Sequence, residues 1–97
     1  MMFTIVCTDR PDCTAIREST RGAHRDYLMP NQSKILHAGA QLDIGGKPCG
    51  SLFIIEVVDR EAAQSFSAND PYVKAGLFES VEIRTYRLSI KDGLRVN

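Results

Sequence analysis

Two arginines and a histidine in one short segment could carry out acid/base chemistry on an anionic substrate. Arg17, Arg21 and His24 lie in the run Arg-Glu-Ser-Thr-Arg-Gly-Ala-His. At about 100° per residue, a helix places these three side chains within roughly 60° of one another. That face holds two fixed cations and one group that titrates near neutrality. The adjacent face is apolar and carries Ile16, Ala23 and Tyr27. We therefore expect the cluster to border a cleft.

Each member of this cluster also has a plainer interpretation. A histidine suits general acid or base catalysis at neutral pH, but a histidine at the boundary of a core gives the same sequence pattern. Arg17 and Arg21 could be solvated helix charges paired with Glu18 or Glu61. Arg21 is the stronger candidate of the two because it lies nearer to His24 in the chain. The sequence leaves the protonation state of His24 open.

Three residues further along the chain could join the same site. Asp70 precedes Pro71, so it could cap a short helical turn. It could also fix the tautomer of a histidine, and a carboxylate has two oxygens for two roles. Tyr72 could line a pocket, although packing is the simpler role. Ser51 follows a glycine, and we expect it to contact substrate, since no base at a known distance supports a nucleophile there.

The elements that must position these residues follow the order β-α-β-β-α-β. Strands are predicted over 2–8, 35–43, 51–58 and 81–89. Helical periodicity predicts a helix over 14–32, and Asp59 is a good N-cap for a second one. A short turn follows Asp70, and 91–97 is a polar C-terminal tail. This order is the ferredoxin-like split βαβ arrangement, an α+β fold in a single domain over 1–97.

The third predicted strand is apolar on both of its faces. One face carries Phe53, Ile55 and Val57, and the other carries Leu52, Ile54 and Val58. Two helices can cover only one face of a four-stranded sheet, so the second face needs another cover. We predict a homodimer in which two such sheets pack face to face.

The amino-acid composition excludes several classes of binding partner and site. Twelve basic residues balance twelve acidic ones, which gives no general field for nucleic acid or an anionic membrane. Cys7, Cys13 and Cys49 are odd in number and lack C-x-x-C spacing, so we expect neither a disulfide framework nor a zinc site, and a reduced, cytoplasmic chain. The apolar N-terminal run ends at Asp9, too early for a signal peptide or a membrane span.

Taken together, these segments resemble the YciI-like (YCII-related) family of small bacterial proteins. The matching stretches are 17–24, Ala38-Gly39, Gly50-Ser51, and Glu61-Ala-Ala-Gln64 running through Asn69-Asp70-Pro71-Tyr72 to Gly76. The resemblance covers the chain from Met2 to about Leu88. The chain departs from the family at Gly22 and Ala40, where relatives carry proline, and in a shorter turn over 43–50. These departures bear on the identity of the substrate and leave the assignment of the histidine and the aspartate unchanged.

The resemblance implies a dimeric α+β barrel of ferredoxin-like protomers with an active site built on a histidine–aspartate pair, here His24 and Asp70. One branch of the family comprises dehydrochlorinases that remove HCl from a chlorinated hydroxyhydroquinone. Muconolactone isomerases are structural cousins. The implied activity is that of a small-molecule lyase or isomerase that uses neither a metal nor an organic cofactor, in the breakdown of aromatic compounds.

On this hypothesis His24 is the general base and Asp70 orients it. Arg21, with Arg17 behind it, stabilises a developing enolate or phenolate oxygen, and Ser51 and Tyr72 contact an anionic or phenolic substrate. The alternative is a non-catalytic ligand-binding or sensor module that uses the same cleft. A purely structural dimer predicts instead that His24 and Asp70 lie too far apart to interact.

Overall fold

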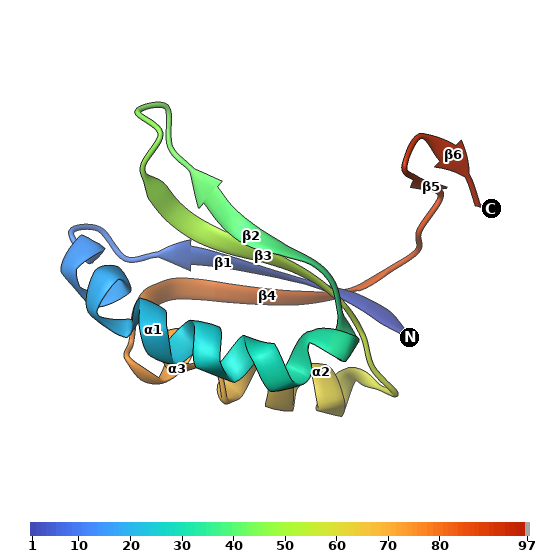
Figure 1. Cartoon of the computed structure of the whole chain (residues 1–97), viewed down its shortest axis with the longest axis horizontal. Coiled ribbons are helices and arrows are strands. Elements are labelled where there is room, and N and C mark those ends of the chain that lie inside the picture. The colour runs from blue at the N-terminus through green and yellow to red at the C-terminus, as the bar shows by residue number, and fades with distance from the viewer. Residues whose placement is uncertain (97) are drawn as a thin grey trace.

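A computed structural model describes residues 1–96 and contains one four-stranded antiparallel sheet with the strand order β2-β3-β1-β4. The strands are β1 (Met2–Asp9), β2 (Ile35–Leu42), β3 (Pro48–Glu56) and β4 (Phe78–Tyr86). The helices are α1 (Thr14–Asn31), α2 (Arg60–Ala68) and α3 (Pro71–Lys74), with a 3₁₀ turn, η1, over Gln32–Lys34. All of these helices lie on one side of the sheet (Figure 1). The predicted ferredoxin-like order is confirmed.

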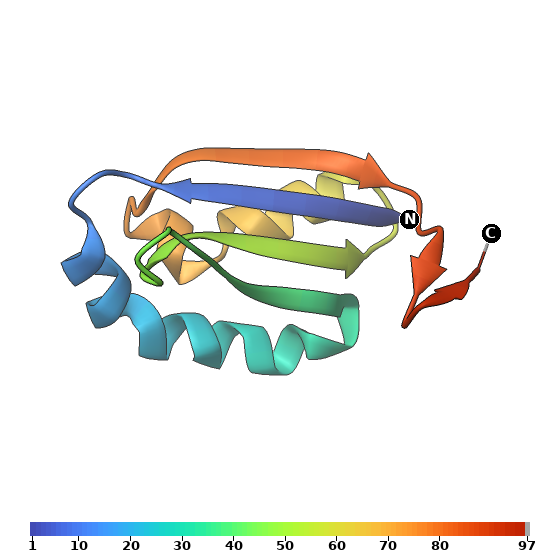
Figure 2. The same ribbon diagram turned by 90° about the horizontal axis from the view of Figure 1, so that it is seen from above.

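The core lies between the sheet and the helices. Phe3 and Ile5 of β1 alternate with partly buried neighbours, and Phe53 and Ile55 of β3 stand beside them in antiparallel register. All four side chains are at most 3% exposed. Seen from above, α1 runs along the β2 side of the sheet, while α2 lies behind the two central strands (Figure 2). The covered face of the sheet is therefore apolar at its centre and meets α1 along one side.

No helix covers the other face, which we call the open face. Val6 of β1 pairs with Leu52 of β3, and the next apolar side chain on this face is Ile54. Leu52 is 37% exposed, and Tyr86 at the end of β4 is 38% exposed. The expectation that β3 is apolar on both faces is met over 52–55. The homodimer inferred from it remains a prediction.

Two strands begin earlier than the sequence predicts. β3 starts at Pro48 because Asp43 and Lys47 close a tight turn, with the Asp43 carboxylate accepting from the Lys47 backbone N–H at 3.0 Å. β3 also ends at Glu56, so Val58 lies beyond it and is 79% exposed. β4 starts at Phe78, directly after Gly76 ends α3 in a left-handed conformation (φ 74°).

The C-terminal segment contains a hairpin that its polar composition did not predict. β5 (Ile90–Lys91) pairs with β6 (Leu94–Arg95) around a turn at Asp92 and Gly93, both of which have positive φ. The hairpin stands apart from the sheet and the helices (Figure 1). The last residue of the predicted tail, Asn97, lies outside the described residues.

Helix α1 runs continuously through Gly22. Of its predicted apolar stripe, Ile16 and Tyr27 pack against the core, whereas Ala23 is exposed. The expected position of Ala23 is therefore wrong: the buried side of α1 turns toward Arg17 instead. Within residues 1–96, no helix is long and apolar enough to cross a membrane.

Candidate active site

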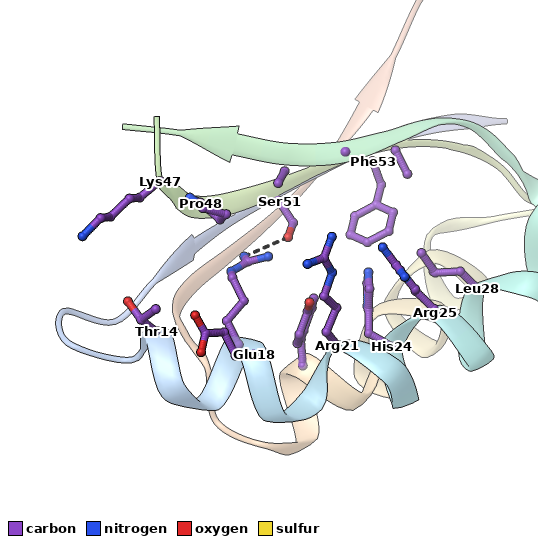
Figure 3. A pocket seen from close by; sticks show the side chains of 15 residues that line it. Thr14, Glu18, Arg21, His24, Arg25, Leu28, Lys47, Pro48, Ser51 and Phe53 are labelled. Carbon is purple, nitrogen blue, oxygen red and sulfur yellow. Dashed lines mark hydrogen bonds between the residues drawn. The ribbon is translucent and has the colours of Figure 1, made fainter. Parts of the chain in front are cut away.

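A cavity of about 690 Å³ opens between α1 and the β2–β3 part of the sheet (Figure 3). Its lining residues are Thr14, Arg17, Glu18, Arg21, His24, Arg25, Leu28, Ala38, Gly39, Ala40, Lys47, Pro48, Ser51, Phe53 and Tyr72. Five of the residues predicted from the sequence are among them: Arg17, Arg21, His24, Ser51 and Tyr72. The sixth, Asp70, is 2% exposed and reaches the site through His24.

His24 and Asp70 form a hydrogen-bonded pair although 46 residues separate them in the chain. His24 Nδ1 lies 2.8 Å from Asp70 Oδ1, and their side chains are 13% and 3% exposed. The contact arises because α1 packs against the short helix α3, which Asp70 caps. In the neutral tautomer that donates to this carboxylate, the proton sits on Nδ1 and the lone pair on Nε2 is free. The structural-dimer alternative, which requires the two residues to be far apart, is wrong.

Asp70 makes both of the contacts that the sequence left open, the helix cap and the bond to a histidine, and makes them through one oxygen. Oδ1 accepts from the Tyr72 backbone N–H at 2.9 Å as well as from His24. Pro71 occupies the first helical position of α3 and needs no hydrogen-bond acceptor there. The same turn therefore fixes the position of the carboxylate and, through it, the orientation of the imidazole.

Aromatic rings hold the imidazole on two sides. Tyr72 stacks on His24 with a centroid distance of 4.0 Å and an interplanar angle of 21°. Phe53 meets it edge-on at 6.2 Å. The imidazole therefore has a fixed plane and a fixed partner before any ligand enters, which is the arrangement that proton transfer requires.

Arg17 is neutralised inside the protein by a residue that the sequence analysis did not single out. Its Nε and Nη2 atoms each donate to the Asp9 carboxylate at 2.8 Å, in a bidentate pair. The hydrogen bond to Asp9 is the main cause of the raised pKa of Arg17, although burial opposes it. Asp9 ends β1 and Arg17 begins the buried side of α1, so the pair forms across a turn and shows no helical spacing. Arg17 is not paired with Glu18 or Glu61.

The same guanidinium organises two other lining residues. Nη2 donates to Ser51 Oγ at 3.2 Å (Figure 3), and the Arg17 Cζ atom lies 4.8 Å from the centroid of the Tyr72 ring. Because Ser51 Oγ accepts this bond, its own hydroxyl hydrogen remains to be donated. Ser51 is thus a hydrogen-bond donor at the wall of the cavity, with a cation behind it.

Gly50 allows Ser51 to stand there. A Cβ atom at Gly50 would collide with the carbonyl oxygen of Cys7 and lie 3.1 Å from the side-chain oxygen of Gln41. Strand β3 therefore passes close to β1 at this residue, where only glycine fits. The Gly50-Ser51 pair noted in the sequence combines a close backbone approach with a hydroxyl on the covered face.

Three cationic side chains lie at the mouth of the cavity. Arg21 and Arg25 rise from α1 toward the sheet on either side of His24, and Lys47 extends from the outer rim (Figure 3). Within the described part of the chain, no carboxylate lies within ion-pair distance of any of these three side chains. The sequence analysis did not select Arg25 or Lys47. Arg25 could have been found, since it follows Arg21 by four residues.

This arrangement combines a base, a hydrogen-bond donor and a cationic entrance in a partly apolar cavity. Such a site can remove a proton from a small oxygenated ring and stabilise the negative charge that results. Over residues 1–96, no group of three or more His, Cys, Asp or Glu side chains is placed to hold a metal ion.

Comparison with known proteins gives consistent matches along most of the chain. The model of the YCII-related domain matches residues 1–87. Protein YciI of Escherichia coli O6:H1 is 32% identical over 95 residues, which cover 90% of this chain and 97% of that protein. Protein YciI of Shigella flexneri matches equally well.

Among solved structures, the 5-chloro-2-hydroxyhydroquinone dehydrochlorinase TftG of Burkholderia phenoliruptrix, in complex with 2,5-dihydroxybenzoquinone, superposes with a TM-score of 0.86. It is 34% identical, and the match covers 90% of this chain and 94% of that one. An antibiotic biosynthesis monooxygenase shares the fold at 16% identity and a TM-score of 0.51, covering 91% of this chain and all of the other.

Proposed function

The chain belongs to the YCII-related domain family, and on that premise we propose that it is a small-molecule lyase or isomerase in which His24 is the general base. The observation that carries the proposal is the 2.8 Å bond between His24 and Asp70 at the wall of a cavity. The bond holds the proton on Nδ1 and turns the basic Nε2 away from Asp70. Asp70 orients the ring and stabilises the imidazolium formed after proton transfer.

A chlorinated hydroxyhydroquinone is our candidate substrate class, because a dehydrochlorinase for such a compound is 34% identical. In the keto tautomer of this substrate, the carbon that bears chlorine is tetrahedral. His24 removes the proton of the hydroxyl group opposite the new ketone. The oxygen electron pair forms a second carbonyl, a ring double bond shifts, and the C–Cl bond breaks with its electrons. The products are a hydroxyquinone, chloride and a proton, with no external oxidant.

Negative charge develops on a ring oxygen during this step, and Ser51 is the group best placed to stabilise it by donating a hydrogen bond. Its hydroxyl is polarised by Arg17, which Asp9 holds at 2.8 Å in a fixed position. A preorganised donor of this kind contributes about 10²-fold to 10³-fold in rate. Tyr72 lines the cavity, and its ring packs against both the imidazole and the Arg17 guanidinium. In this mechanism Arg17 acts through Ser51 rather than as a free cation.

Turnover tests the proposal. Purified protein is incubated with chlorinated hydroxyquinols and with muconolactones, and product is followed by ultraviolet absorbance and chloride release. His24→Gln should lower kcat by about 10²-fold or more, the usual size of acid/base catalysis. The matched control is His37→Gln, since His37 is the other histidine of the chain, lies on β2 and does not line the cavity.

A non-catalytic binding or sensor module is the alternative, favoured by the same partly apolar cavity. Binding of a phenolic or carboxylate compound without product from any member of the panel would support it. If His24→Gln lowers kcat by less than a few-fold, His24 is not the general base.

We propose further that the protein acts as a homodimer in the cytoplasm, in the degradation of aromatic compounds. Leu52, Ile54 and Val6 form an apolar strip on the open face that no helix covers. A second copy would bury this strip by the same hydrophobic effect that forms the core. The cysteines of the described chain are free, which suits a reducing compartment.

A further inference from the structure

Three arginines project from one side of α1, and among residues 1–96 only the first of them is paired with a carboxylate. Arg17, Arg21 and Arg25 are spaced by four residues, so they stand one above the other along the helix. Asp9 neutralises Arg17 with two hydrogen bonds. Arg21 and Arg25 remain as an unmatched pair of like charges, which destabilises a helix unless an anion lies between them.

Both of these arginines are exposed to solvent and also line the mouth of the cavity. They line it together with His24 and point toward the sheet (Figure 3). Lys47 adds a third positive charge at the rim, against the single carboxylate of Glu18. In the described chain Glu18 makes no ion pair with any of them. The entrance therefore carries an excess of positive charge beside the base.

We propose that Arg21 and Arg25 form a carboxylate-binding subsite at the entrance, so that the cavity also takes hydroxylated rings that carry an acid group. This deepens the proposed function and rests on it: the carboxylate lies at the entrance while the ring hydroxyl reaches His24. Guanidinium groups bind carboxylates in a planar, bidentate manner, which also orients the ring. A chlorinated hydroxyhydroquinone lacks such a group and would use only the inner half of the site.

Binding of two probes that differ by one carboxylate tests this inference. Calorimetry compares 2,5-dihydroxybenzoate with hydroquinone on the purified protein. The acid should bind about 10-fold or more tightly, as expected for hydrogen bonds to charged groups. Arg21→Gln and Arg25→Gln should each remove most of this preference and leave hydroquinone binding within about 2-fold. Arg87→Gln is the matched control, since Arg87 directly follows the end of β4 and does not line the cavity.

Several outcomes would overturn the inference. Equal affinity for the two probes, or binding of neither, excludes a carboxylate site. A drop in the unfolding midpoint of Arg21→Gln with an unchanged probe preference would assign Arg21 a structural role. These measurements do not depend on turnover. Selective acid binding without catalysis would therefore retain the arginine pair and reject the proposed lyase or isomerase, whereas catalysis without acid selectivity would do the reverse.

Discussion

The ion pairs on the two faces of the sheet differ in their exposure to solvent. On the covered face, Arg17 and Asp9 are each about 10% exposed at the side chain and form a bidentate pair. On the open face, Arg84 and Glu82 also form an ion pair, but their side chains are 75% and 56% exposed. Among the described residues, no buried side-chain nitrogen or oxygen lacks a hydrogen-bond partner. The ion pair on the covered face is thus shielded from water, while the ion pair on the open face of the protomer is exposed to it.

The largest expected effect comes from breaking the covered pair. Asp9→Asn leaves the Arg17 guanidinium buried without a counter-charge. Removal of one partner of a buried pair lowers the free energy of unfolding by about 3–5 kcal/mol. The matched change on the open face, Glu82→Gln, should alter it by about 0–1 kcal/mol, because water screens exposed charges. Urea denaturation of both variants measures the difference.

Equal losses in the two variants would contradict the contrast between the faces. Asp9→Asn should also free the Arg17 guanidinium to move away from Ser51, to which it donates a hydrogen bond. Turnover should therefore fall even at temperatures where the variant is folded. A variant that is destabilised but fully active would show that the Arg17–Ser51 bond is not used in the reaction.

The next effect concerns association through the open face. Leu52→Asp places a charge at the centre of the apolar strip, where it should weaken a face-to-face dimer by about 30-fold or more, the usual size for a buried interface anchor. Ile44→Asp is the control, since Ile44 lies in the β2–β3 turn and is fully exposed. Sedimentation equilibrium measures both. A wild-type chain that stays monomeric at high concentration would reject the dimer.

A smaller expected loss of stability tests the close approach of β3 to β1 at Gly50. Gly50→Ala should lower the free energy of unfolding by about 1–3 kcal/mol, because the new methyl group meets the Cys7 carbonyl. Gly39→Ala, also on a strand but with no atom within 4 Å of its Cβ position, should be nearly neutral. Similar losses at both glycines would mean that the close approach at Gly50 does not constrain Ser51.

Local chemistry explains what the sequence could predict. Asp59 and Asp70 both accept a backbone N–H as N-caps, as their positions before the helices predict. The helical spacing of Arg17, Arg21 and His24 brings all three to one cavity. These features depend on residues within one or two turns of one another.

Features that depend on tertiary contacts were out of reach of the residues alone. Asp9 pairs with Arg17 only because β1 and α1 meet across a turn, and no periodicity marks that pair. Asp70 reaches His24 across 46 residues, and its role came from the family resemblance rather than from spacing. The hairpin around Gly93 lies in a polar segment whose strands are two residues long, too short for an alternating pattern.

The smallest expected effect is a loss of stability at alkaline pH. It distinguishes the buried thiol of Cys7 from the exposed thiol of Cys49. Burial, and then the charge of Asp70, raises the pKa of Cys7 from 9.0 to about 12. Above pH 9 the unfolded chain loses this proton while the folded chain keeps it, so the folded state becomes less favourable as pH rises toward 12. Between pH 8 and pH 10 this difference amounts to about 1 kcal/mol of unfolding free energy.

Cys7→Ala should remove this alkaline loss, although its stability at pH 8 is lower because a cavity remains. Cys49→Ala, at an exposed position on β3, should retain the loss in full. Urea denaturation at pH 8 and pH 10 gives the change for each protein. An identical alkaline loss in wild type and Cys7→Ala would mean that the Cys7 thiol ionises as readily in the folded protein as in the unfolded chain. The covered face would then admit more water than its paired charges and buried side chains indicate.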